Sequence, residues 1–228
     1  MYQKAKVEAS EKEHIAAPAS TMLADAWIRL KKNKAAVVAL FILIGIILLA
    51  IFAPIFSKYS FRDTDYNNVY GLPSAAHIFG ADQFGRDLWV RTWMGTRISL
   101  MIALVAAILD LVVGVLYGAV SALFGGKVDA VMQRIIEVLV GIPSLIIVIN
   151  VMFTIPSAIF TEAFLSFIGI GLAEPQASLG VLINGGYQVL RMYPHVLIFP
   201  AIVIVLIMVC FSILGDGLRD ALDPQMRK

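Results

Sequence analysis

The stretch from Val138 to Leu172 constrains the fold of this chain more than any other. It contains 35 residues and a single formal charge, Glu162. As one straight helix it would be about 52 Å long, whereas the hydrocarbon core of a bilayer is about 30 Å thick. The stretch is too long for one simple crossing, and it lacks the polar turn of a two-helix hairpin. It predicts a membrane protein in which the central span is broken.

The composition agrees with an all-α membrane protein. Hydrophobic residues make up 60% of the 228 residues, charged residues make up 15%, and the mean hydropathy is +0.86. Such a chain is too apolar for a soluble domain, and a net charge of +2 gives no sign of nucleic-acid binding. One cysteine, Cys210, excludes an intramolecular disulfide, and the three histidines lack the spacing of metal ligands. The polar start predicts no cleavable signal peptide.

Four apolar stretches divide the chain. Residues 1–34 are predicted to be a leader with an interfacial helix, because Leu23, Trp27 and Leu30 share one helical face. Polar loops are expected at 57–97 and 173–195, and a short polar helix at 128–137. The transmembrane domain covers 35–215 and a polar tail covers 216–228, with spans predicted at about 35–55, 98–124, 138–172 (broken) and 196–215.

The distribution of lysine and arginine predicts the orientation. Four basic residues lie within the six positions before the first span, and others lie in the 125–137 connection and in the tail. The positive-inside rule therefore places the N-terminus, this connection and the C-terminus in the cytoplasm. The broken stretch must then cross an odd number of times, which gives about four spans.

Two acidic residues lie inside apolar stretches, Asp110 in the second and Glu162 in the third. An acid in the membrane is costly, so each is a candidate for a translocation path. The alternative is a carboxyl group that bonds to a neighbouring helix, which for Glu162 includes help from Thr161. Asn150 is a third candidate for a path or a helix interface.

Glycine and proline mark further positions in the spans. Gly114 and Gly118 form a Gly-xxx-Gly pair, which allows another helix to approach closely. Pro143 and Pro156 each remove a backbone hydrogen bond, and the freed carbonyls need protein or water partners. Kinked spans around a water-filled path and ordinary kinks packed against a partner both remain open.

No pattern for catalysis is legible. The dipeptide Gly126-Lys127 lacks the earlier glycine and the following Ser or Thr of a phosphate-binding loop, and no Ser/His/Asp or Cys/His set is recognisable. We therefore expect no enzyme activity and no cofactor in this chain. Energy for any transport must come from another chain or from an ion gradient.

Four strings carry a resemblance to a known family. They are FGADQFGRDLWVRTWMGTRISL at 79–100, GGKVDAVMQRIIEVLVGIPSLIIVI at 125–149, FTIPSAIFTEAFLSFIGIGL with EPQASLG at 153–180, and the ending from Pro200. Together they resemble the C-type permease subunits of ATP-binding cassette (ABC) importers for oligopeptides and dipeptides, over nearly the whole chain. The resemblance implies a bacterial inner or plasma membrane protein. It also implies as partners a B-type permease, two cytoplasmic ATPases that hold ATP and magnesium, and an extracellular peptide-binding lipoprotein.

The chain departs from the family between Ile149 and Asn150. Members of the family resemble six-span proteins with a cytoplasmic loop, marked by Glu-Ala-Ala…Gly, which docks into the ATPase. Here the fourth span and this coupling loop are absent, and the sequence of the third span is followed directly by that of the fifth. Either the protein lacks the segment or a stretch is missing from the sequence. True contiguity predicts helix on both sides of the junction, with the main bend near Pro156.

Three functions remain open at this point. The first is a permease subunit of a peptide importer in a shortened form. The second is a degenerate, non-transporting membrane relative, which the absent coupling loop favours. The third is an ion-coupled carrier that would use Asp110 and Glu162, although four spans leave little room for alternating access.

Overall fold

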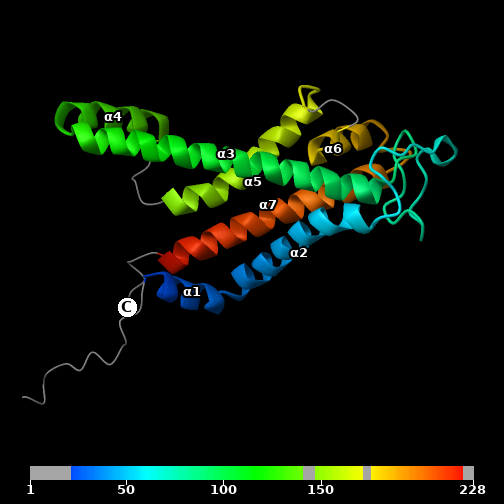
Figure 1. Ribbon diagram of the computed structural model, residues 1–228, viewed down its shortest axis with the longest axis horizontal. Helices are drawn as coiled ribbons and strands as arrows, with labels where there is room; N and C mark the ends of the chain where they lie inside the picture. The colour runs from blue at the N-terminus through cyan, green and yellow to red at the C-terminus, as the bar shows by residue number, and fades with distance from the viewer. Residues whose placement is uncertain (1–21, 141–146, 172–175, 223–228) are drawn as a thin grey trace, which may run out of the picture.

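The computed structural model describes residues 22–140, 147–171 and 176–222, and of residues 22–26, 136–140, 147–152 and 222 it describes the backbone alone. An isolated antiparallel bridge pairs Ala81 with Asp87. Otherwise the regular structure of the described part is helical (Figure 1). The α-helices are α1 (Met22–Lys32), α2 (Lys34–Phe56), α3 (Leu88–Phe124), α4 (Gly126–Val140), α5 (Ile147–Phe167), α6 (Leu179–Gln188) and α7 (His195–Leu222), with a 3₁₀ turn at Tyr66–Asn68.

Four long helices form the body of the molecule. α7 packs against both α2 and α5, and α5 packs in turn against α3 (Figure 1). The short helix α6 lies at the end of this bundle where α3 begins, beside the loop that links α2 to α3. At the other end, α1 packs against α7 and α4 packs against the last part of α3.

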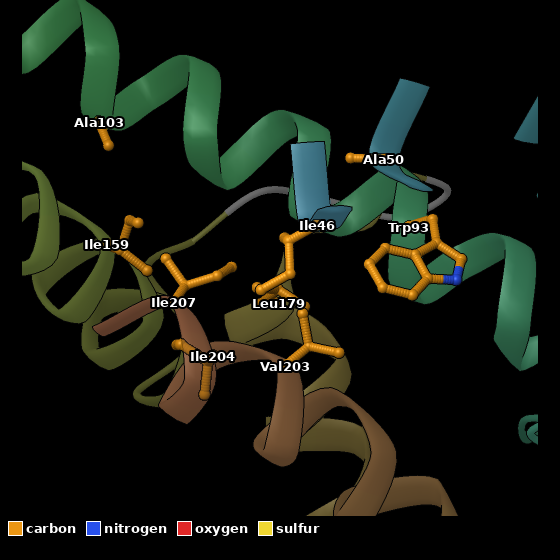
Figure 2. Packing of buried hydrophobic residues seen from close by; sticks show 9 residues of the cluster. All are labelled: Ile46, Ala50, Trp93, Ala103, Ile159, Leu179, Val203, Ile204 and Ile207. Carbon is orange, nitrogen blue, oxygen red and sulfur yellow. The ribbon is translucent and has the colours of Figure 1, made fainter. Parts of the chain in front are cut away.

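The core lies where α2, α3, α5, α6 and α7 meet. Leu179, at the start of α6, is fully buried between Ile46 of α2 and residues of α7 (Figure 2). Many large apolar side chains on the outer faces are exposed, including Phe41 and Leu116. A surface of this kind suits contact with lipid, because the driving force for burying it is absent in a bilayer. The nine core residues are Ile46, Ala50, Trp93, Ala103, Ile159, Leu179, Val203, Ile204 and Ile207.

The bundle confirms the predicted multi-span, all-helical fold class. Among the described residues, α2, α3 and α7 are long and apolar enough to cross a membrane. α5 supplies a fourth apolar helix, shorter over the part searched, Phe153–Phe167. The leader contains α1, in which Leu30 is buried and Trp27 is half exposed. The place of α1 in a membrane interface stays a prediction.

The helix that contains the predicted second span, 98–124, begins before residue 98, and the membrane boundary itself stays a prediction. α3 begins ten residues earlier, where the side chain of Asp87 accepts a hydrogen bond from the N–H of Val90 (2.9 Å). Two arginines made this first part of the helix look like a polar loop. Arg91 is buried in an ion pair and Arg97 bonds to α2, so both charges are satisfied within the protein. α3 therefore has 37 residues, about 55 Å of continuous helix.

The predicted broken span at 138–172 falls on two helices. α4 ends at Val140 and α5 covers Ile147–Phe167, and the residues between them lie outside the described part of the chain. α5 runs through Ile149 and Asn150, which confirms helix on both sides of the junction. Pro143 lies outside the described residues. Pro156 lies within α5, and the main bend expected there stays a prediction.

Two boundaries near the C-terminus also differ from the predictions. The 173–195 region is not only a loop, because α6 forms there with Ser178 as its N-cap. Its glycines allow close packing instead of turns. The helix of the last predicted span continues past residue 215, because α7 reaches Leu222 and includes the start of the expected tail. α7 is still packed against α2 in this last part, because a Cβ added at Gly217 would lie 2.6 Å from Cβ of Ala36.

In the loop cap, residues 57–87, the buried carboxylate of Asp82 makes several contacts. Asp82 accepts hydrogen bonds from the N–H groups of Phe84 (2.9 Å) and Arg86 (3.0 Å). One of its oxygens, Oδ2, also lies 2.7 Å from Nε of Arg86 and 3.1 Å from Nε of Arg91. All three charged side chains are buried. Burial, together with the nearby carboxylate of Asp82, raises the pKa of Tyr70 above its ordinary value.

An arginine of α3 donates to a carbonyl that a proline leaves without a partner in α2. Pro54 lies inside α2 and has no N–H to donate to the carbonyl of Ala50, four residues earlier. Nε of Arg97 donates to this carbonyl (3.1 Å), and Nη2 donates to the carbonyl of Ile51 (2.8 Å). The same side chain thereby joins α3 to α2.

Replacing Arg97 with methionine should lower the stability of the protein by on the order of 1 kcal/mol, because the carbonyl of Ala50 loses its donor. In a Pro54→Ala background the cost should be smaller, because the new N–H can bond to that carbonyl. Unfolding of the two single variants and the double variant in detergent micelles, as a double-mutant cycle, measures this coupling. Equal costs in both backgrounds would contradict the assigned role of Arg97.

Candidate functional site

A groove with a volume of about 1200 Å³ runs between α3 and α5. Most of its lining is apolar, from residues such as Ile102 and Phe153. Both acids singled out from the sequence line it, Asp110 from α3 and Glu162 from α5. The packing of α5 against α3 thus brings together two residues that are 52 positions apart in the chain.

Glu162 lies at the closed, buried side of this groove. One carboxyl oxygen accepts a hydrogen bond from the hydroxyl of Ser99 on α3 (2.9 Å), and the other accepts one from Ser166 on α5 (2.9 Å). Ser99 Oγ also accepts the N–H of Leu179, the first residue of α6 (3.3 Å). The start of a helix carries partial positive charge, which favours an acid nearby. Glu162 thereby connects three helices.

Thr161 does not assist Glu162 as the sequence suggested. Its hydroxyl donates to the carbonyl of Ser157, one turn earlier in α5 (2.8 Å). Ser157 in turn donates to the carbonyl of Phe153 (2.9 Å). Both hydroxyls are exposed and both residues line the groove, so they add a polar strip to the wall formed by α5.

Asp110 differs from Glu162 in its surroundings. Its side chain is exposed, and none of the described residues forms a hydrogen bond or an ion pair with it. It lies in the middle of an apolar helix, where lipid offers no donor. The structure places Asp110 at the groove, and its carboxyl group is available to a ligand, to water or to another helix.

The Gly-xxx-Gly pair lies on the same side of α3. Gly114 lines the groove, and Gly118 lines a smaller hollow of about 350 Å³ between α3 and α4. A Cβ added at either position would meet no atom within 4 Å. No helix in the described part of the chain uses these glycines for close packing, so that prediction has no partner within it.

The remaining candidates are placed less fully. Pro156 is buried in α5, near the groove. The backbone of Asn150 lies in the first turn of α5, and its side chain lies outside the described residues. Pro143, as stated above, lies outside them entirely.

Sequence reasoning missed the serines that hold Glu162. Ser99 and Ser166 are isolated polar residues in apolar helices, and both are buried, as is Ser178. The spacing of Glu162 and Ser166, one helical turn, could have indicated that pair. The partnership with Ser99 could not be read, because it depends on how α3 and α5 pack together.

Two family models match the chain. The model of the N-terminal transmembrane domain of oligopeptide transport permease C matches residues 21–73. The model of the inner membrane component of binding-protein-dependent transport systems matches residues 150–228. The second match begins at Asn150, the residue where the sequence departs from the family pattern.

Curated relatives match nearly the whole chain. The oligopeptide transport system permease protein OppC of Bacillus subtilis is 36% identical over 298 positions, which cover 100% of this chain and 98% of the relative. The chain belongs to the oligopeptide and dipeptide permease family. The dipeptide transport system permease protein DppC of Bacillus subtilis is 35% identical, covering 96% of this chain and 90% of the relative. OppC of Escherichia coli K12 is 32% identical, covering 89% and 91%.

Membership of this family confirms the resemblance read from the four strings. It makes the chain a multi-pass component of a membrane transport system, and the relatives are transport permeases, not enzymes. The family also implies ATPase and substrate-binding subunits as partners.

The alignment to the Bacillus permease also reveals an internal difference in length. It spans 298 positions, whereas this chain has 228 residues, all of them covered. At least 70 aligned positions therefore have no counterpart in this chain. This difference agrees with the missing span and loop inferred from the sequence.

Proposed function

We propose that this chain is a transmembrane permease subunit of an ATP-driven importer of oligopeptides or dipeptides. The observation that carries the proposal is 36% identity with an oligopeptide permease in an alignment that covers 100% of this chain and 98% of the relative. A dipeptide permease is almost as similar, so we leave the length of the peptide open.

The groove between α3 and α5 is the part of the chain best suited to form a wall of a translocation path. It is about 1200 Å³ in volume, mostly apolar, and has an available carboxyl group at Asp110. A carboxyl group in a site of low polarity attracts an ammonium group, such as the N-terminus of a peptide. Glu162 is already bonded to two serines, so its role is to hold the wall together.

The proposed partners are a B-type permease, two cytoplasmic ATPases and an extracellular peptide-binding lipoprotein, all in the membrane of a bacterial cell. ATP and magnesium would be bound by the ATPases, and this chain would need no cofactor of its own. The N- and C-termini would face the cytoplasm, since the basic residues gather at the corresponding ends of the spans.

A second candidate function is a membrane relative that associates with a permease but does not transport. The specific observation in its favour is the absence of at least 70 aligned positions, where the sequence lacks the coupling loop. The resemblance implies that members of this family contact the ATPase through that loop. A chain without it would lack this contact.

Reconstitution distinguishes the two functions. The purified chain, its partner permease, both ATPases and the binding protein are placed in liposomes, and ATP-dependent uptake of a labelled peptide is measured. The proposed function predicts uptake that requires ATP and every partner, and no ATP hydrolysis by this chain alone.

The matched control is the full-length Bacillus OppC in the same assembly with its own partners. Assembly with the permease, but no retention of the ATPases and no uptake, would support the second function. ATP hydrolysis by the purified chain, free of contaminating ATPase, would contradict both.

A further inference from the structure

The α3 side of the groove carries Asp110 and Gly114, and Gly118 continues the same face of the helix beyond the groove. Asp110, Gly114 and Gly118 recur at every fourth position, so they form a stripe along one face of the helix. Across the groove, α5 presents the exposed hydroxyls of Ser157 and Thr161. The mostly apolar groove therefore has a few small or polar residues on each of its two walls.

Most glycines packed inside this bundle mark a close approach to a neighbour. A Cβ on Gly180 would lie 2.5 Å from Cα of Ala163, and one on Gly186 would lie 2.7 Å from Cα of Leu197. Gly217 likewise meets Ala36 at 2.6 Å. Gly114 and Gly118 also lack a side chain, but a Cβ added at either position would meet no atom within 4 Å. Their face of α3 lacks the close neighbour that Gly180, Gly186 and Gly217 have.

The charge of the groove specifies what that neighbour must offer. Asp110 is exposed in an apolar helix, and no described residue bonds to it. Lipid tails cannot donate a hydrogen bond, so an unpartnered carboxyl group there costs several kcal/mol. A helix that presents small residues to the two glycines and a donor side chain to Asp110 would satisfy both features.

The sequence comparison indicates where such a helix belongs. At least 70 positions of the Bacillus permease have no counterpart here, whereas one span needs only about 20 residues. The family match begins at Asn150, in the first turn of α5. α5 forms one wall of the groove from Phe153 onward. The absent segment would thus join the chain right beside the open groove.

We propose that the groove is a docking site for the transmembrane segment that this chain lacks, supplied by a second polypeptide of the same family. The segment would pack on the stripe formed by Asp110, Gly114 and Gly118. This binding needs no transport activity, so it can be tested separately from the proposed function.

The test co-expresses the full chain with a tagged peptide that carries the segment of Bacillus OppC without a counterpart here. The peptide should co-purify with the chain in mild detergent. Replacing Gly114 or Gly118 with leucine should lower its recovery about tenfold, because the helix can no longer approach closely. Gly45→Leu is the matched control. This glycine of α2 also meets nothing within 4 Å and lies away from the groove, so recovery should be unchanged.

A second measurement leaves Asp110, Gly114 and Gly118 unchanged. A photocrosslinking amino acid at Ser157 should form an adduct with the peptide, whereas the same group at Phe41, exposed on α2, should not. The proposal is overturned if the peptide is not retained, or if Gly45→Leu lowers recovery as much as Gly114→Leu does. Crosslinks from Ser157 only to lipid, or only to a second copy of the chain, would also overturn it.

Discussion

Replacing Asp82 with alanine is expected to lower the free energy of unfolding by about 3 to 5 kcal/mol, the largest effect of any single change considered. This carboxylate is shared by Arg86 and Arg91, both buried, and it also accepts two backbone N–H groups. Its removal takes away the carboxylate that both buried guanidinium groups contact. Thermal or denaturant unfolding of the purified variant in detergent measures the loss.

Asp63→Ala is the control for this prediction. Asp63 lies in the same loop cap, is exposed, and accepts a single backbone hydrogen bond, from Ser60 (2.8 Å). Its replacement should change the stability by less than about 1 kcal/mol. If both variants unfold alike, the cluster around Asp82 does not organise the loop cap.

Replacing Gly180 with valine is expected to cost about 3 kcal/mol, because overpacking at a close helix contact forces the backbones apart. A Cβ there would lie 2.5 Å from Cα of Ala163 and 2.8 Å from Cβ of Ser166. Neither atom can move without α5. The change should displace α6 and disturb the serine and Glu162 contacts beside it, and the same unfolding assay measures the loss.

Gly185→Val in the same helix provides the comparison for Gly180. A Cβ at Gly185 meets no atom within 4 Å, so only the helix propensity of the residue changes. The variant should be close to the original protein in stability. A cost at Gly185 as large as that at Gly180 would show that α6 does not depend on the contact with Ala163.

Hydropathy predicted the apolar spans because the bilayer limits spanning segments to long apolar helices. It failed where charges are satisfied inside the protein. Arg91 and Arg97 made the start of α3 look like a loop, although one pairs with Asp82 and the other bonds to α2. α6 was missed for a related reason. Its glycines are typical of turns, but Gly180 and Gly186 serve close packing here.

The sequence predicted the two acidic residues of the candidate site, but it did not predict what surrounds each of them. Asp110 and Glu162 stand out in any apolar run, but their difference in exposure depends on tertiary packing. Glu162 is buried by α5 and α6 and bonded to Ser99, a residue 63 positions away. Asp110 faces the open groove. A one-dimensional pattern cannot separate two such residues, since each is a single acid within an apolar helix.

The length and continuity of α3 have a mechanical consequence. α2, α5 and α7 each contain a proline, at Pro54, Pro156 and Pro200, whereas α3 has none in its 37 residues. It is therefore about 55 Å of helix without a proline kink, which starts at the loop cap and packs against α4 at its other end. A tilt of about 10° at the anchored end would swing the far end by about 10 Å, so a small rotation at the loop cap would become a large displacement at α4.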